Sequence, residues 1–166
     1  MIEHSSPTIE KPDFELLKNV VYSSHLSENG LVRDFEAKMK NFIGTKFAIA
    51  TNSGTSALHL MLLGLNISKG SEVILPSYVC SSVLNTIIYT GSRPVVCDIE
   101  SDSFNLSPKD AQRKLTAKTK AIILPYMFGR GSPNIDKFLE LDLPIIEDCA
   151  QSLGATYNSK RLGSFG

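Results

Sequence analysis

The chain has 166 residues, a length that fits one α/β domain or part of a larger one. Hydrophobic residues make up 42% of it, which is enough for a packed core and too many for a disordered tail. Basic and acidic residues both number 17, so the formal net charge is zero and no basic excess points to nucleic acid or to anionic lipid. Function must therefore come from a local site.

The cysteines and the N-terminus indicate a cytoplasmic protein. Cys80, Cys97 and Cys149 form no CxxC motif, and their odd number argues against a disulfide framework. We expect reduced, mostly buried thiols, and no His/Cys/Asp cluster has the spacing of metal ligands. Residues 1–7 lack the basic start and apolar centre of a signal peptide. No apolar run approaches the ~20 residues that span a bilayer, so no membrane association is expected.

The first elements in the chain are predicted to be helices, and residues 1–45 are interpreted as a helical N-terminal segment. Residues 14–21 show mixed helical spacing. Residues 32–42 carry apolar side chains at steps of three and four, which place them on one helix face. These side chains are Val32, Phe35, Met39 and Phe42. Gly44 then follows as a C-terminal cap.

From residue 46 onward, apolar runs alternate with helical segments. The predicted strands are 47–51, 72–75, 94–99, 121–125 and 144–148. The predicted helices are 53–65, 81–89, one that opens at Ser107-Pro108, and 136–141. Strands that are apolar on both faces and separated by helices indicate an α/β fold with a mainly parallel sheet covered on both faces. Ligands of such sheets bind beyond the carboxyl ends of the strands.

The first polar stretch at such an end runs from Thr51 to Leu58, directly from a predicted strand into a helix. Gly54 would let backbone N–H groups approach an anion at the helix N-terminus, which favours negative charge. The hydroxyls of Thr55 and Ser56 would add hydrogen bonds. A plain helix with Ser53 as its cap is an equally good interpretation. The stretch is neither a P-loop nor a dinucleotide fingerprint.

The second polar stretch, Ile145 to Gln151, has carboxylates at the end of a strand. Asp148 there could keep a pyridine nitrogen protonated. Taken alone, a helix cap or a solvated acid explains it better. Asp98 is another acid at a strand end, without a specific role. His59 is interpreted as a helix-surface or core residue.

In combination, the motifs of the chain resemble one family of enzymes. The stretches that carry the resemblance are Phe35-Glu36, 53–60, 70–76, 91–99, 119–123, 146–155 and 163–166. They occur, over residues 30–166, in the order found in the DegT/DnrJ/EryC1/StrS family of sugar aminotransferases, which depend on pyridoxal 5′-phosphate (PLP). Single stretches are weak signals, whereas the ordered set is specific.

The resemblance implies roles for individual positions. Gly54, Thr55 and Ser56 would hold the cofactor phosphate, Asp148 would pair with the pyridine nitrogen, and Gln151 would approach the 3-oxygen of the ring. The implied fold is the large domain of fold-type I PLP enzymes, and the implied assembly is a homodimer. The implied substrates are a nucleotide-linked keto sugar and an amino-acid donor such as glutamate.

Two features depart from the family pattern. The ring-stacking aromatic residue would fall at Cys80, with Tyr78 as a nearby substitute. The lysine that forms the Schiff base is expected beyond Gly166, and Lys160 matches no catalytic position. No catalytic residue is therefore assigned within the chain.

Residues 46–166 are accordingly interpreted as an incomplete large domain, without its last strands and the C-terminal small domain. The segments near Ile49 and Ile146 would then expose unpaired edges. We expect the chain alone to be inactive and marginally stable.

Three alternatives remain open from the sequence. One is the PLP-dependent sugar dehydratase branch of the same family, in which a histidine beyond the end of this chain replaces the lysine. Another is a truncated, non-catalytic module that binds PLP reversibly or holds a partner subunit. The third, a doubly wound nucleotide-binding protein unrelated to PLP, fits the ordered motifs poorly. The sequence does not name the sugar, the carbon that is aminated or the amino donor.

Overall fold

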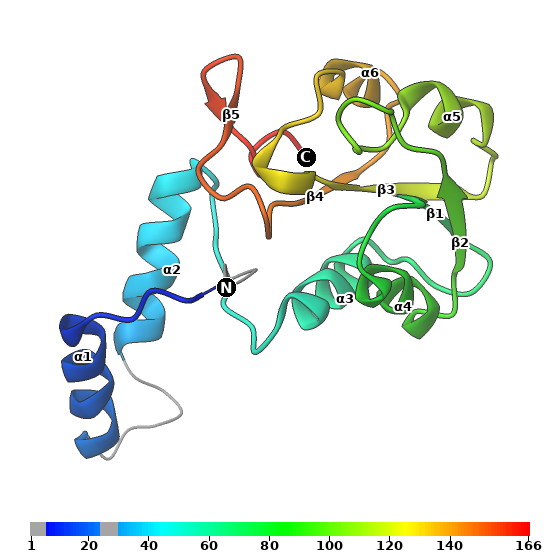
Figure 1. Cartoon of the computed structure of the whole chain (residues 1–166). Helices are drawn as coiled ribbons and strands as arrows, with labels where there is room; N and C mark the ends of the chain where they lie inside the picture. The colour runs from blue at the N-terminus through cyan, green and yellow to red at the C-terminus, as the bar shows by residue number, and fades with distance from the viewer. Residues whose placement is uncertain (1–5, 24–29) are drawn as a thin grey trace.

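The computed structural model describes residues 6–23 and 30–166, so predictions that concern residues 1–5 or His25 lie outside the described residues (Figure 1). Two helices begin the chain, α1 (Lys11–Tyr22) and α2 (Gly30–Ile43), and they stand as an arm beside the sheet (Figure 1). Neither helix contains a buried residue. Gly44 ends α2 in the left-handed conformation, with φ 90°, as predicted.

Four parallel strands form the central sheet. They are β1 (Glu72–Pro76), β2 (Arg93–Cys97), β3 (Thr119–Pro125) and β4 (Ile145–Asp148). The strand order is β2-β1-β3-β4, and each neighbouring pair is parallel. The α/β fold class predicted from the sequence is therefore confirmed. Because the chain leaves β1 toward one edge and returns on its other side, β1 and β3 flank the switch point where such sheets bind ligands.

Helices cover both faces of this sheet (Figure 1). One face carries α3 (Gly54–Gly64) and α4 (Ser81–Tyr89), and the other carries α5 (Pro108–Arg113) and α6 (Ile135–Leu139). The pleat of the strands divides the core into two layers. In β3, Ala121 and Ile123 pack toward α3 and α4, whereas Ile122 and Leu124 pack toward α5 and α6. Near-continuous apolar strands are what a sheet buried on both faces requires.

One predicted strand is wrong. Residues 47–51 form no strand and pair with none among the described residues, and Phe47 and Ile49 are 81% and 79% exposed. The side chain of Glu36 in α2 holds this segment instead, through a 2.8 Å hydrogen bond that the Ala50 N–H donates to Oε1. An apolar run becomes a strand only when a ladder partner satisfies its backbone, and the described residues supply none here.

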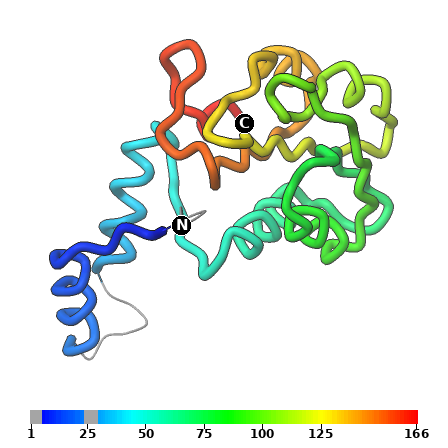
Figure 2. Tube along the Cα trace, viewed as in Figure 1, coloured from blue at the N-terminus to red at the C-terminus, as the bar shows by residue number. Residues whose placement is uncertain are grey.

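The last part of the chain closes against the arm. A 3-10 turn, η1 (Met127–Gly129), follows β3, and a short hairpin of β5 (Thr156–Tyr157) and β6 (Lys160–Arg161) follows β4. The trace brings the end of α2 beside this hairpin (Figure 2). The Arg161 guanidinium lies 3.9 Å from the centre of the Phe42 ring, a cation–π contact that joins the two segments.

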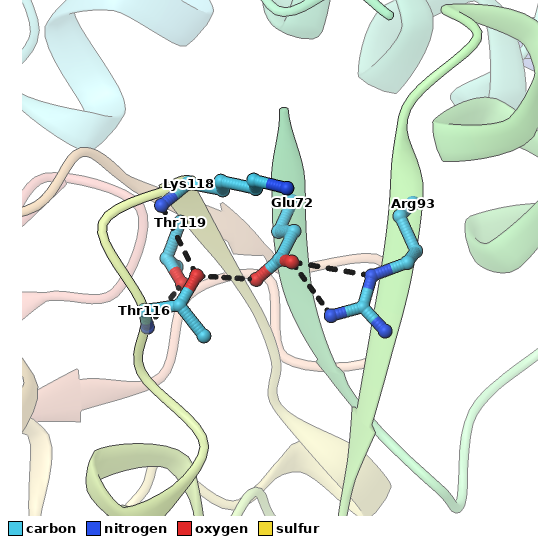
Figure 3. Close-up of polar contacts among 5 residues, drawn as sticks. All are labelled: Glu72, Arg93, Thr116, Lys118 and Thr119. Carbon is cyan, nitrogen blue, oxygen red and sulfur yellow. Dashed lines mark hydrogen bonds and ion pairs between the residues drawn. The ribbon is translucent and has the colours of Figure 1, made fainter. Parts of the chain in front are cut away.

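A buried carboxylate links three segments at the amino end of the sheet (Figure 3). Glu72 of β1 is 4% exposed, and its Oε1 accepts from Nε and Nη2 of Arg93 in β2, at 3.2 and 2.6 Å. Its Oε2 accepts from the Thr116 hydroxyl at 2.7 Å. These bonds, first from Thr116 and then from Arg93, lower the pKa of Glu72. The carboxylate therefore has its charge and both oxygens satisfied within the fold.

Candidate active site

The N-terminus of α3 presents free backbone donors. Ser53 caps the helix, because its Oγ accepts from the Ser56 N–H at 3.1 Å, and its hydroxyl donates to Ser56 Oγ at 3.0 Å. The cap leaves the N–H groups of Gly54 and Thr55 without an acceptor among the described residues. No atom lies within 4 Å of the position that a Cβ on Gly54 would take. The helix N-terminus thus combines two free donors with open space, which suits an anion.

A cavity of about 510 Å³ opens in front of this helix end, at the carboxyl ends of β1, β3 and β4. It brings together five of the residues singled out in the sequence, although they come from three separate parts of the chain. These residues are Gly54, Thr55, Cys80, Asp148 and Gln151. Ser56 and Tyr78 are not among the residues that line it. The cavity lies where doubly wound sheets bind their ligands.

Asp148 supplies a carboxylate with unused acceptor capacity. It is the last residue of β4, and its Oδ1 accepts one hydrogen bond, from the Ala150 N–H at 3.0 Å. No lysine or arginine among residues 6–23 and 30–166 forms a salt bridge with it. An ionised carboxylate accepts about four hydrogen bonds, so the position favours a ligand that brings a cationic N–H.

The side-chain amide of Gln151 is held in one orientation. Its Oε1 accepts from the backbone N–H of Phe128 at 2.9 Å. This contact leaves Nε2 as the free end, and no acceptor for it occurs among the described residues. Gln151 therefore offers the cavity a hydrogen-bond donor, which an electron-rich ring oxygen would accept.

The two positions considered for ring stacking differ in their surroundings. Cys80 lines the cavity as the residue before α4 and is exposed, contrary to the expectation of mostly buried thiols. Hydrogen bonding from Ser82 lowers the pKa of its thiol. Tyr78 instead contacts Phe104 and Phe128, with ring centroids 6.0 and 6.2 Å away.

Sequence reasoning missed the role of Glu147 beside this cavity. Its carboxylate accepts four hydrogen bonds, from the Tyr126 hydroxyl and from three backbone N–H groups near the end of the chain. The donors are Tyr126 at 2.8 Å, Gly163 at 2.8 Å, Phe165 at 2.6 Å and Gly166 at 2.8 Å. The motif marked the residue as acidic, but its donors lie 16 to 21 positions away and no local pattern reveals them. Glu147 thus ties residues 163–166 to β4.

A second cavity, of about 540 Å³, lies between α2, the 47–51 segment and α3. Apolar side chains such as Phe35, Met39, Phe47 and Met61 line most of it. Within the described ranges no group of three metal-ligating side chains occurs, and no helix is long and apolar enough to cross a membrane. The polar chemistry therefore concentrates at the carboxyl end of the sheet.

The fold and the polar cavity define an α/β protein that presents free N–H groups at a helix N-terminus and an acid at a neighbouring strand end. Comparison with known proteins assigns the chain to a family. Residues 7–166 match the model of the DegT/DnrJ/EryC1/StrS aminotransferase family, and the chain belongs to it. This is a family of PLP-dependent sugar aminotransferases.

Relatives and solved structures agree with this assignment. GDP-perosamine synthase of Vibrio cholerae is 34% identical over 171 residues, which cover 100% of this chain and 46% of the relative. An aminotransferase structure from Psychrobacter cryohalolentis has a TM-score of 0.91 and 30% identity, covering 96% of this chain and 42% of that one.

A third match is GDP-4-keto-6-deoxy-D-mannose-3-dehydratase from E. coli with bound hydrated PLP. It has a TM-score of 0.87 and 27% identity, covering 98% of this chain and 44% of that one. The chain thus spans less than half the length of each relative.

Proposed function

We propose that the chain is the N-terminal, cofactor-binding portion of a PLP-dependent aminotransferase. Its substrates would be a nucleotide-linked keto sugar and an amino-acid donor such as glutamate. One observation carries the proposal. The free N–H groups of Gly54 and Thr55, the unpaired carboxylate of Asp148 and the amide of Gln151 all line one cavity. An anion site, an acceptor for a cationic ring N–H and a donor for a ring oxygen are three of the contacts that would hold PLP.

Each residue has a chemical task in this proposal. Gly54 and Thr55 would bind the phosphate through backbone N–H groups and the helix dipole, with the Thr55 and Ser56 hydroxyls as further donors. Asp148 would hold a proton on the pyridine nitrogen, and Gln151 would orient the ring through its 3-oxygen. When bound, the cofactor supplies an electron sink for chemistry at the substrate carbon. Cys80, at the cavity wall, is proposed to take the stacking position, with Tyr78 as a second candidate from outside the wall.

The arrangement of the chain within a larger enzyme is also proposed. Residues 1–45 would form a helical segment, and residues 46–166 would contribute to the large domain of a cytoplasmic homodimer. The dehydratase branch is a second candidate function, since a solved dehydratase shares this fold at a TM-score of 0.87. Assays of an enzyme that extends beyond Gly166 would distinguish the aminotransferase from the dehydratase. The product sugar would distinguish them, because a transaminase leaves a new amino group on the sugar, whereas a dehydratase removes a hydroxyl group as water and leaves no amino group.

The test is a binding titration of purified residues 1–166 with PLP, followed by absorbance of the cofactor. We expect saturable binding, and we expect pyridoxal, which lacks the phosphate, to bind at least about tenfold more weakly because hydrogen bonds to a charged group are lost. Inorganic phosphate should compete with PLP and raise its apparent Kd.

A matched control separates the proposed site from other surfaces of the chain. Glu72→Gln alters a carboxylate at the opposite end of the sheet and should leave the PLP affinity unchanged. Absence of saturable binding, or equal affinity for PLP and pyridoxal, would contradict the proposed function.

A further inference from the structure

The orientation of Gln151 depends on a turn that belongs to another part of the chain. Phe128, in η1, donates the N–H that Gln151 Oε1 accepts, although the two residues are 23 positions apart. Gly129 also abuts Gln151, because a Cβ on this glycine would lie 3.5 Å from the Gln151 carbonyl oxygen. The residues that hold this turn in place therefore also determine which end of the Gln151 amide is free.

The turn has an unfavourable backbone conformation. Phe128 has φ 57° and ψ 30°, in the left-handed region that residues with a Cβ seldom adopt. A single hydrogen bond closes it, from the Arg130 N–H to the Met127 carbonyl at 3.1 Å. Such a conformation persists only where neighbouring groups impose it.

Asn105 is the group that spans this turn. Its side chain is fully buried, at 0% exposure. Its Oδ1 accepts from the Met127 N–H at 2.9 Å, and its Nδ2 donates to the Arg130 carbonyl at 3.1 Å. One amide thus binds the backbone on both sides of Phe128.

Aromatic packing supports the same geometry. The Phe128 ring lies 5.7 Å from the ring of Phe104 and 6.2 Å from that of Tyr78, measured between centroids. Phe104 directly precedes Asn105 and is itself left-handed, with φ 58°. The clamp and the ring that packs on the turn therefore come from one short loop.

We propose that Asn105 is a positioning residue for the cofactor site, and this proposal rests on the proposed function. By clamping the Met127–Arg130 turn, Asn105 keeps the Phe128 N–H on Gln151 Oε1. This contact presents Gln151 Nε2 as a donor to the 3-oxygen of a pyridoxal ring. Without the clamp, the turn would relax and the Gln151 amide would lose its fixed orientation.

The experiment compares the affinity of residues 1–166 for PLP and for the PLP analogue that lacks the 3-hydroxyl. The wild-type chain should prefer PLP by about fivefold, the worth of one hydrogen bond. Gln151→Glu keeps an acceptor for Phe128 but removes the donor, so this preference should disappear. In Asn105→Ser the shorter side chain cannot bridge the turn. The ratio of the two Kd values should therefore fall close to one.

Asn134→Ser is the matched control. The Asn134 amide donates to Glu100 Oε2 at 2.8 Å and forms no hydrogen bond with the turn among the described residues, so the preference should remain. If Asn105→Ser lowers the affinity for both ligands by the same factor, Asn105 has only a structural role and the proposal is wrong. If Asn105→Ser fails to fold, Asn105→Asp keeps the acceptor for Met127 while losing the donor to Arg130, and it should lower the preference in the same direction.

Amide hydrogen exchange, measured without ligand, tests the role of Asn105 independently of PLP binding. It therefore distinguishes a failure of this inference from a failure of the proposed function. Asn105→Ser and Gln151→Ala should each accelerate exchange of the Phe128 amide by about tenfold, because each removes a restraint on it. An unchanged Phe128 amide in Asn105→Ser would overturn the inference even if PLP binds. Accelerated exchange in a chain that binds no PLP would contradict the proposed function and leave the clamp intact.

Discussion

Acidic side chains at the two ends of the sheet differ in their bonding partners. At the amino end, Glu72 is buried and satisfied by Arg93 and Thr116 (Figure 3). At the carboxyl end, Asp148 accepts one local hydrogen bond and has no cation among the described residues. Neighbouring Glu147 is occupied by backbone donors instead of a cation.

This difference separates structural groups from groups available to a ligand. A buried charge must be paired for the fold to tolerate it, as Glu72 is. Groups that remain unpaired beside a cavity, such as Asp148 and the N–H of Gly54, gain a partner only when something binds. The comparison therefore predicts that changes at the amino end alter stability, whereas changes at the carboxyl end alter ligand affinity.

The largest effect is expected in cysteine reactivity. Burial raises the pKa of Cys97 and of Cys149 to about 11, whereas the pKa of exposed Cys80 lies below its usual value. Because a thiolate is the nucleophile, Cys80 should alkylate at least about 100-fold faster than the other two at pH 8. Iodoacetamide labelling followed by peptide mass spectrometry measures the three rates. PLP in the cavity should slow the labelling of Cys80, which lines it, and should leave that of Cys97 unchanged, because Cys97 does not line it. Similar rates for all three would contradict the packing described.

The next effect is a loss of stability at the amino end. Glu72→Ala removes the acceptor for Arg93 and Thr116 and should lower the free energy of unfolding by about 2–3 kcal/mol. Urea unfolding followed by circular dichroism measures the change. The affinity for PLP should stay within about twofold, because the substitution is at the far end of the strands. An unaltered free energy of unfolding would mean that this network adds nothing to the fold.

Asp148→Asn is the counterpart at the carboxyl end. It removes the charge but keeps one acceptor oxygen for the Ala150 N–H, so the free energy of unfolding should change by less than about 0.5 kcal/mol. The Kd for PLP should rise by about tenfold, because a hydrogen bond to a charged group is lost. The two substitutions measured together test the comparison directly. A larger stability loss for Asp148→Asn than for Glu72→Ala would reverse it.

Features that depend on local sequence were predictable. Ser53 caps α3, which was one of the two interpretations of this stretch, because the capping hydroxyl and the N–H it satisfies are three residues apart. The four strands that form the sheet were all placed within two residues, since each is an apolar run between helical segments. The strand proposed at 47–51 failed because strand formation depends on a distant partner as well as on composition.

The geometry of the cavity could not be predicted from local sequence, because it too depends on contacts between distant residues. The contact between Gln151 and Phe128 joins residues 23 positions apart, and Asn105 reaches the turn across 22 to 25 positions. The left-handed Phe128 could not be expected, because local preference assigns that conformation to Gly, Asn or Asp. The motifs pointed to five residues that line the cavity, and to Ser56 and Tyr78, which do not line it. The tertiary structure was needed to see how their hydrogen-bonding capacity is shared.

The smallest expected effect concerns pH, and it isolates the charge of Glu72. The pKa of Glu72 is lowered in the folded chain from a reference value of 4.5, so the unfolded chain takes up this proton first as the pH falls. The stability from this charge is therefore complete above about pH 5 and is lost as the pH falls through the lower, folded pKa. Glu72→Gln should be about 1 kcal/mol less stable than the wild-type chain at pH 7.

That gap should narrow as the pH falls below about 4.5 toward the lower pKa of Glu72 in the folded chain. Asp110, whose pKa is lowered to about 2 by the Asp98 N–H and by Lys114, is present in both proteins, so its contribution cancels in the difference. Urea midpoints at several pH values give the difference directly. A gap that stays constant over the whole acid range in which the wild-type chain remains folded would assign the effect of Glu72 to the geometry of its hydrogen bonds. The contrast between the two ends of the sheet would then no longer be one of charge.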